Sequence, residues 1–142
     1  MTRLYLHEEE AISCYYRWLD AFNLRDIEGM LNEMHFPHWR ISGNNSLQVW
    51  QTEDQQRELH DGMTDNLQLE GWVRTISTGL RVIHSSKTKV HIAMRQSRLN
   101  DLNEEYNGFE TLWIMCLIQG RWGAQFRSSF SNGVSEIGVV TK

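Results

Sequence analysis

The sequence has very little proline and cysteine, and it has no long apolar run. Its 142 residues include one proline and two cysteines, which are too few for a collagen-like chain or a disulfide scaffold. The longest apolar run, residues 112–118, has the length of a strand and falls well short of the roughly 18 residues of a membrane-spanning helix. These shortages predict a globular chain that has no membrane partner.

Positive charge is also scarce. Lys and Arg number 14 against 18 for Asp and Glu, and the basic residues are scattered along the chain. Nucleic-acid binders usually carry a basic stripe, so no nucleic-acid partner is expected. The first ten residues are polar and acidic, so we expect no secretory signal and a cytoplasmic location. Cys14 and Cys116 lie in apolar segments, as expected of buried, reduced thiols.

The residues that are present fit a single domain spanning residues 1–142. Hydrophobic residues make up 40% and charged residues 23% of the chain, which is ordinary for a globular domain of this length. The unusual number is six tryptophans. Tryptophan is large and amphipathic and often lines pockets and interfaces, although each one can also simply fill the core.

Hydrophobic periodicity divides the chain into a helical part followed by strands. Apolar spacing predicts a helix over 8–22, a short second helix after Asn23, and a third helix that Thr52 caps. Strands are expected at 35–41 and 47–50, and then four long ones in an antiparallel meander after Gly71. Helices on one face of an antiparallel sheet define an α+β fold. The meander strands cover residues 72–84, 89–99, 105–118 and 121–130.

Turn positions fix which side chains of the meander face the helices. A two-residue turn at Gln119-Gly120 pairs Met115 with Ala124, and a four-residue loop at 101–104 pairs Gln96 with Phe109. A three-residue loop at 86–88 places Val82 and every second residue before it on the same face. A two-residue loop would instead bury Arg81 and expose Val82. The inward face then includes the following residues: Ile76, Thr78, Leu80, Val82, Val90, Ile92, Met94, Gln96, Arg98, Phe109, Thr111, Trp113, Met115, Trp122, Ala124, Phe126, Ser128 and Phe130.

Polar groups gather at one end of this inward face. Gln96, Arg98, Thr111 and Ser128 point at the core there, and inward polar groups need partners. We predict a pocket of roughly 300–1,000 Å³ with these polar anchors and with aromatic walls from three residues: Tyr15, Trp18 and Phe109. The alternative is an open rim, at which the hydroxyls bond to the backbone. One bulge in these strands would reverse the faces beyond it and turn Glu110 and Arg127 inward.

The outward face of the fifth strand is unexpectedly apolar. Leu112, Ile114, Cys116 and Ile118 alternate along it. A contiguous apolar patch suggests a protein interface, and most oligomers are twofold homodimers. We therefore expect a homodimer that forms through the sheet.

Three segments resemble uncharacterised bacterial SnoaL-like members of the NTF2-like superfamily, which is also called cystatin-like. They are His-Phe-Pro-His-Trp-Arg-Ile (35–41), Lys-Val-His-Ile-Ala (89–93) and the ending Gly-Arg-Trp-Gly-Ala-Gln-Phe-Arg-Ser-Ser-Phe (120–130). The resemblance covers residues 8–131. It implies a conical α+β fold, in which a curved sheet wraps around three N-terminal helices. Relatives of this kind include ketosteroid isomerases, polyketide cyclases, epoxide hydrolases, dehydratases and proteins without activity.

The candidate chemistry is sparse. His35 and His38 would point to opposite faces of a strand, and no third ligand stands at a metal spacing, so no metal is expected. No nucleophile elbow, phosphate loop or dinucleotide fingerprint is present, so no cofactor is expected. There is also no Asp or Glu between residues 35 and 50, where isomerase-like relatives usually carry their base. What remains is His38 as a general base and Arg98 as a stabiliser of negative charge on oxygen. The alternatives are a structural His38 and an ion pair of Arg98 with Glu104 or Glu105.

Three functions therefore stand open. The first is binding of a small, mostly apolar organic molecule at Tyr15, Trp18, Gln96, Phe109, Thr111 and Ser128. The second is a metal-free acid–base lyase, isomerase or cyclase that uses His38 and Arg98. The third is a dimerisation module without catalysis.

Overall fold

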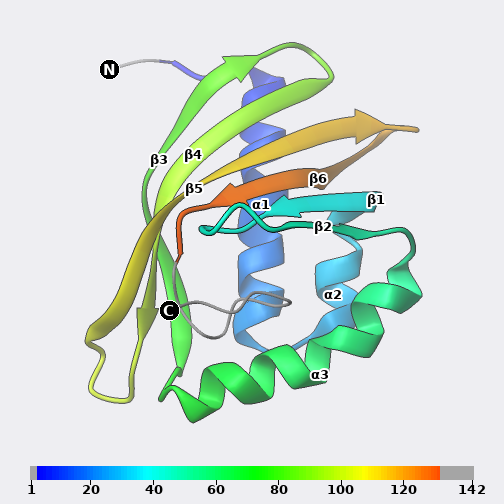
Figure 1. Ribbon diagram of the computed structural model, residues 1–142. Coiled ribbons are helices and arrows are strands. Elements are labelled where there is room, and N and C mark those ends of the chain that lie inside the picture. Colours follow the sequence, from blue (N-terminus) through cyan, green and yellow to red (C-terminus); the bar gives the residue numbers. More distant parts are fainter. Residues whose placement is uncertain (1–2, 132–142) are drawn as a thin grey trace.

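Three helices and six strands make up the computed structural model, which describes residues 3–131. The helices lie on one side of a single curved sheet, whose strand order is β2-β1-β6-β5-β4-β3 (Figure 1). This arrangement confirms the predicted α+β class. The elements are α1 (Leu6–Asn23), α2 (Ile27–Leu31), β1 (Met34–Ile41), β2 (Leu47–Trp50), α3 (Glu53–Leu69), β3 (Arg74–Ser85), β4 (Lys89–Leu99), β5 (Glu105–Ile118) and β6 (Arg121–Ser129).

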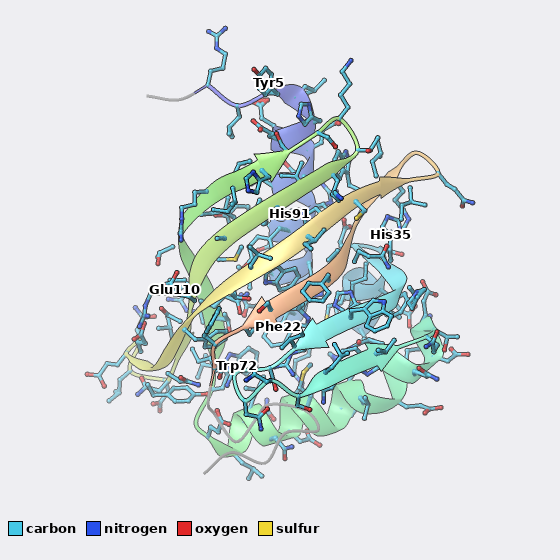
Figure 2. The ribbon with its side chains drawn as sticks, turned by 45° about the horizontal axis from the view of Figure 1, so that its top comes forward. Tyr5, Phe22, His35, Trp72, His91 and Glu110 are labelled. Atoms are coloured by element: carbon cyan, nitrogen blue, oxygen red, sulfur yellow. The ribbon has the colours of Figure 1, made fainter. Side chains whose placement is uncertain are left out.

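An aromatic cluster joins α1 to the sheet. Trp113 of β5 packs edge-on against Tyr15 and Trp18 of α1, with ring centroids 4.9 and 4.7 Å apart. Phe22, one turn further along α1, stacks on Trp18 and meets Trp72, which precedes β3. Figure 2 shows the sheet in front of α1, with Phe22 and Trp72 toward α3. Because these rings bury large apolar areas, the predicted inward face of α1 becomes the centre of the core.

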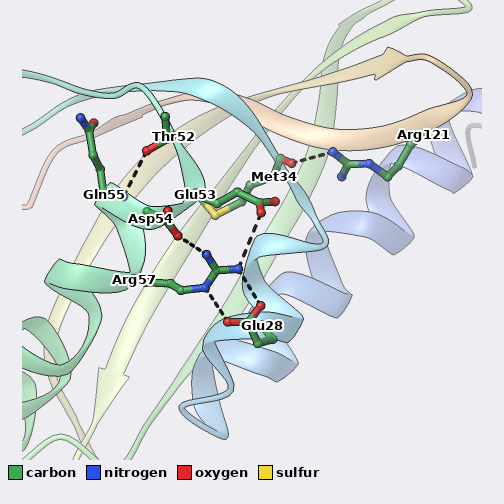
Figure 3. Close-up of polar contacts among 8 residues, drawn as sticks. All are labelled: Glu28, Met34, Thr52, Glu53, Asp54, Gln55, Arg57 and Arg121. Atoms are coloured by element: carbon green, nitrogen blue, oxygen red, sulfur yellow. Dashed lines mark hydrogen bonds and ion pairs between the residues drawn. The ribbon is translucent and has the colours of Figure 1, made fainter.

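The helix α3 is held across the end of the sheet by its first turns. Thr52 caps it as predicted, since its side chain accepts the backbone N–H of Gln55 at 3.3 Å. Arg57 then forms two hydrogen bonds, of 2.6 and 2.9 Å, to the carboxylate of Glu28 in α2 (Figure 3). The contact with Arg57 lowers the pKa of Glu28. These contacts place the second half of α3 opposite the sheet.

Much of the predicted register is confirmed. Gln96 pairs with Phe109 and Ile92 with Trp113 between β4 and β5. Met115 pairs with Ala124 next to the turn at Gln119-Gly120, where both residues have positive φ. The alternation of apolar residues was therefore sufficient to set the faces of β4, β5 and the beginning of β6.

The end of β6 differs from the prediction because of one bulge. Between the pairs Met115–Ala124 and Ile114–Phe126, β6 contains the extra residue Gln125. An extra residue reverses the side-chain faces beyond it. Phe126 and Ser128 therefore leave the predicted inward face, and Phe130 is exposed as well.

Two further bulges bend β3. The register shifts between Thr78 and Arg81, where Gly79 has φ 65°, and again between Val82 and His84. Val82 pairs with Ile92 and keeps its predicted face, but Thr75 and Ser77 face inward beyond the Gly79 bulge in place of Ile76 and Thr78. Residues 86–88 connect β3 to β4 as predicted, but the second bulge shifts the pairing next to this loop, so that Ser85 pairs with Val90. Added residues in one strand increase its bend and twist, which gives the sheet its curvature.

Cys14 and Cys116 are free; Cys14 is fully buried and Cys116 half-buried. Burial raises the pKa of Cys14 to about 12.

Over residues 3–131, no helix is long and apolar enough to cross a membrane.

Candidate functional site

A cavity of about 50 Å³ lies between the concave face of the sheet, the end of α1 and the second half of α3. It is far smaller than the predicted pocket. By the measure of roughly 10–15 Å³ per water molecule it holds about three to five waters. Half of its lining is apolar and half polar: Trp18, Phe22, Met63, Leu67, Phe109 and Trp113, and Arg40, Thr75, Gln96, Arg98, Arg127 and Ser129.

Four of the eight residues predicted for the site line this cavity. They are Trp18, Gln96, Arg98 and Phe109. Three others, Tyr15, His38 and Thr111, are buried but do not line it. Ser128, the eighth, lies on the opposite face because of the bulge in β6.

Tyr15 supports the wall from behind. It is fully buried, and its hydroxyl accepts a hydrogen bond of 2.9 Å from the side-chain amide of Gln96. Burial raises the pKa of Tyr15, so the phenol stays neutral near pH 7. The pair fixes the Gln96 amide at the cavity.

Thr111 matches the alternative interpretation, in which inward hydroxyls bond to the backbone. Its Oγ1 donates to the carbonyl oxygen of Ser128 at 3.1 Å and lies 3.0 Å from Oγ of Ser129. Ser129 takes the inward place that was predicted for Ser128, since it pairs with Thr111 across the strands.

His38 is fixed by hydrogen bonds at both ring nitrogens. Nε2 accepts from Nε–H of Arg127 at 3.2 Å, because arginine is a donor only. Nδ1 therefore carries the proton and donates it to the carbonyl oxygen of Ala124 at 3.0 Å. Burial, and then the nearby charge of Arg127, hold the pKa of His38 well below its usual value. The ring is neutral, and its lone pair is already in use.

Arg127 lines the cavity, although the sequence placed it inward only in the case of a bulge. The bulge at Gln125 turns it inward, against the faces of Trp18 and Trp113, at 5.7 and 5.4 Å from the ring centroids. Burial, and then the charge of Arg40, lower its pKa to about 9, so it stays cationic at neutral pH. Glu110, in contrast, stays on the outside of the sheet.

Two further arginines line the same cavity. Arg98 stacks on Phe109 at 5.1 Å and faces a carboxylate oxygen of Glu70 at 3.8 Å. The acidic neighbour of Arg98 is thus Glu70, and not Glu104 or Glu105 as in the alternative interpretation; Glu105 bonds to Arg95 at 2.7 Å. Arg40, from β1, donates to the side chain of Gln48 at 2.9 Å. Burial, and then Arg98, lower the pKa of Arg40 to about 10.

The two histidines of the 35–38 pair have separate environments. His35 lies with Nε2 at 3.1 and 3.0 Å from the carbonyl oxygens of Cys116 and Arg121, whereas His38 meets Ala124 and Arg127. Within residues 3–131 there is no group of three or more His, Cys, Asp or Glu side chains that could hold a metal ion.

Comparison with known proteins identifies the fold. Neither a family model nor a curated protein matches the sequence. Solved structures do match, beginning with a protein of unknown function with a cystatin-like fold from Nostoc punctiforme. It has a TM-score of 0.71 at 12% identity, over 92% of this chain and 95% of that chain.

Two other solved structures extend the comparison. An NTF2-like protein from Cytophaga hutchinsonii and a ketosteroid isomerase-like protein from Erwinia carotovora atroseptica each have a TM-score of 0.67 at 12% identity. Each match covers 92% of this chain and 99% of the other. The chain thus has the NTF2-like, or cystatin-like, fold that its sequence motifs predicted. Because this fold carries many unrelated functions, the likeness assigns no activity.

Proposed function

We propose that the protein binds a small organic molecule in the cavity between the sheet, α1 and α3. The observation that carries this proposal is the composition of the lining, in which aromatic and aliphatic walls face six polar side chains. Ligand sites combine apolar walls with a few placed polar groups in this way. The lining is more polar and the volume smaller than the sequence predicted, so the ligand we propose is small and amphipathic.

The acid–base alternative receives less support from the geometry. A general base must present a free lone pair within hydrogen-bond reach of the substrate. His38 has both ring nitrogens occupied and does not line the cavity. Arg98 does line it, and on its own it provides charge for binding rather than proton transfer. We therefore propose a binding protein and no catalytic step.

We also propose that two copies of the chain associate through the outer face of the sheet. Ile114 and Phe126 are paired neighbours on that face, and Trp39 pairs with Phe126 from β1. The bulge in β6 supplies Phe126 to this apolar row. This pairing is compatible with ligand binding, because the cavity opens on the other side of the sheet, among the helices.

The binding proposal is tested by filling the cavity. Met63 lines it from a half-buried position on α3, and Leu59 lies one turn earlier, exposed and away from the cavity. We expect compounds that raise the melting temperature of the wild type in a thermal-shift screen to lose this effect in Met63→Trp and to keep it in Leu59→Trp. A ligand at 100 times its Kd stabilises a fold by about 2.7 kcal/mol, which such a screen resolves. Equal shifts in both variants would place the binding elsewhere.

A further inference from the structure

The guanidinium of Arg127 is the most unusual charge in the protein. Arg127 is half-buried and turned toward the cavity, and among residues 3–131 its side chain has a single hydrogen bond, from Nε to His38. Its other contacts are the faces of Trp18 and Trp113, and the charged side chain that influences it most is the cation of Arg40. No carboxylate of the described chain meets it. A buried charge normally has a partner of opposite sign, so this position calls for an anion.

The orientation of Arg127 leaves one edge of its fork for that anion. Nε–H is used by His38, and the two terminal nitrogens make no hydrogen bond to the described residues. Arg127 lines the cavity. The paired N–H groups of a guanidinium match the two oxygens of a planar carboxylate. His38, held neutral by its bond to Ala124, fixes the direction in which this fork points.

Two further lining residues carry hydrogen-bond donors without a partner. The indole N–H groups of Trp18 and Trp113 are buried and have no hydrogen-bond partner among the described residues. Together with the terminal nitrogens of Arg127, they leave unmet donors on three lining residues. A deprotonated carboxylate has two acceptor oxygens and no donor, which is the complement of such a lining.

Size and the apolar half of the lining limit the rest of the molecule. Space for roughly three to five waters corresponds to a ligand of about as many heavy atoms. Phe22, Leu67 and Met63 face the cavity from the helices, and they favour a short hydrocarbon body. A phosphate can also accept two hydrogen bonds from a guanidinium, but it has no apolar part to pack against these side chains.

We propose that the cavity binds a short-chain monocarboxylate, whose carboxylate group meets the terminal nitrogens of Arg127 and whose hydrocarbon part lies against α1 and α3. This inference rests on the proposed small-molecule function and adds the charge and class of the ligand. Arg98 and Arg40 raise the positive potential of the cavity, and Glu70 at 3.8 Å offsets part of the charge of Arg98. Arg127 is the anchor.

The test compares each acid with its own neutral amide. Acetate, propionate and butyrate, and then acetamide, propionamide and butyramide, are titrated into the wild-type protein at low ionic strength and pH 7.5. Binding is followed by NMR through the indole N–H and arginine Nε–H resonances, which report on Trp18, Trp113 and Arg127. We expect propionate, whose five heavy atoms fit the cavity, to bind at least tenfold more tightly than propionamide and to shift these resonances.

Variants assign the preference to Arg127. In Arg127→Met, which keeps an unbranched apolar stem and removes the charge, the ratio of acid to amide affinity should fall to about one. Arg81→Met removes an exposed arginine of β3 and should keep the wild-type ratio. If Arg127→Met does not fold, Arg127→Lys keeps the charge without the fork, and we expect acid binding to weaken about tenfold relative to the wild type.

Each other outcome has a distinct meaning. Amides that bind as tightly as their acids would overturn the carboxylate proposal and leave small-molecule binding in place. Binding of inorganic phosphate without any carboxylate would overturn the ligand class. If no acid, amide or screened compound binds the wild type at the cavity, the proposed function itself is wrong.

Discussion

His38 makes the stability of the fold depend on pH. In the unfolded chain a histidine titrates near pH 6.5, but burial and the charge of Arg127 hold the pKa of the folded His38 well below that value. Below about pH 6.5 the unfolded state therefore binds more protons than the native state, and stability falls as the pH falls. Burial also lowers the pKa of His35, which acts in the same direction.

We predict that the free energy of unfolding decreases between pH 7.5 and pH 5.5, and that His38 alone contributes a slope approaching 1.4 kcal/mol per pH unit toward the lower end of this range. Urea unfolding at several pH values measures it. His38→Gln keeps an acceptor for Arg127 and cannot titrate, so its pH dependence should be shallower than that of the wild type. A wild-type slope in His38→Gln would contradict this role for His38.

At the level of residues, the sequence predicts the site only as far as its strands are regular. Alternation along β4 correctly placed Gln96 and Arg98 inside, because no bulge interrupts that part of its pairing with β5. It placed Ser128 inside and Arg127 outside, and a single extra residue, Gln125, reverses both. The sequence of β6 does not reveal the bulge at Gln125, because β6 buries some apolar residues whether the bulge is present or absent. Only tertiary pairing with β1 and β5 decides between them.

At the level of elements, glycine has opposite roles in β3 and α3. Gly79 sits at a bulge with φ 65°, a conformation that other residues adopt at a cost of about 1–2 kcal/mol. Gly62 lies in the interior of α3, exposed, with open space around the position of a Cβ atom. There glycine weakens the helix by roughly 0.5–1 kcal/mol relative to alanine.

We therefore predict opposite signs for one chemical change. Gly79→Ala should destabilise the protein by about 1 kcal/mol or more, and Gly62→Ala should stabilise it by about 0.5–1 kcal/mol. Chemical denaturation of both variants beside the wild type gives the two differences. Because both changes add one methyl group, a shared sign would show that backbone conformation does not govern the bulge at Gly79.

Element types and order were predicted well, and strand irregularities were not. The periodicity of α1 and the Thr52 cap of α3 are local signals, and the structure confirms both. The bulges at Gly79 and Gln125 bend the sheet, and the bend depends on how the whole sheet packs around α1. The pattern of residues along one strand does not contain that information. Only the bulge at Gly79 has a sequence signal, because a glycine within a strand often marks a bulge.

At the level of the whole molecule, the sheet has two faces with different tasks. The concave face holds the aromatic cluster and the cavity, and the outer face carries a row of apolar side chains across three strands, formed by Trp39, Phe126 and Ile114. Trp39 is 37% exposed, and the other two are half-buried. The bulge that turns Arg127 into the cavity also turns Phe126 out, so one irregularity shapes both faces.

We predict that the protein is a dimer at micromolar concentration and that the outer row forms its interface. Ile114→Glu places a charge in the middle of the row, where burial against a second copy would cost far more than exposure to water. Sedimentation velocity should then show twice the mass of the chain for the wild type and a single chain for Ile114→Glu, with an unchanged circular dichroism spectrum. Leu69→Glu, at the exposed end of α3 (86% exposed), should remain dimeric. A monomeric wild type would remove the interface altogether, and a dimeric Ile114→Glu would move it to another face of the molecule.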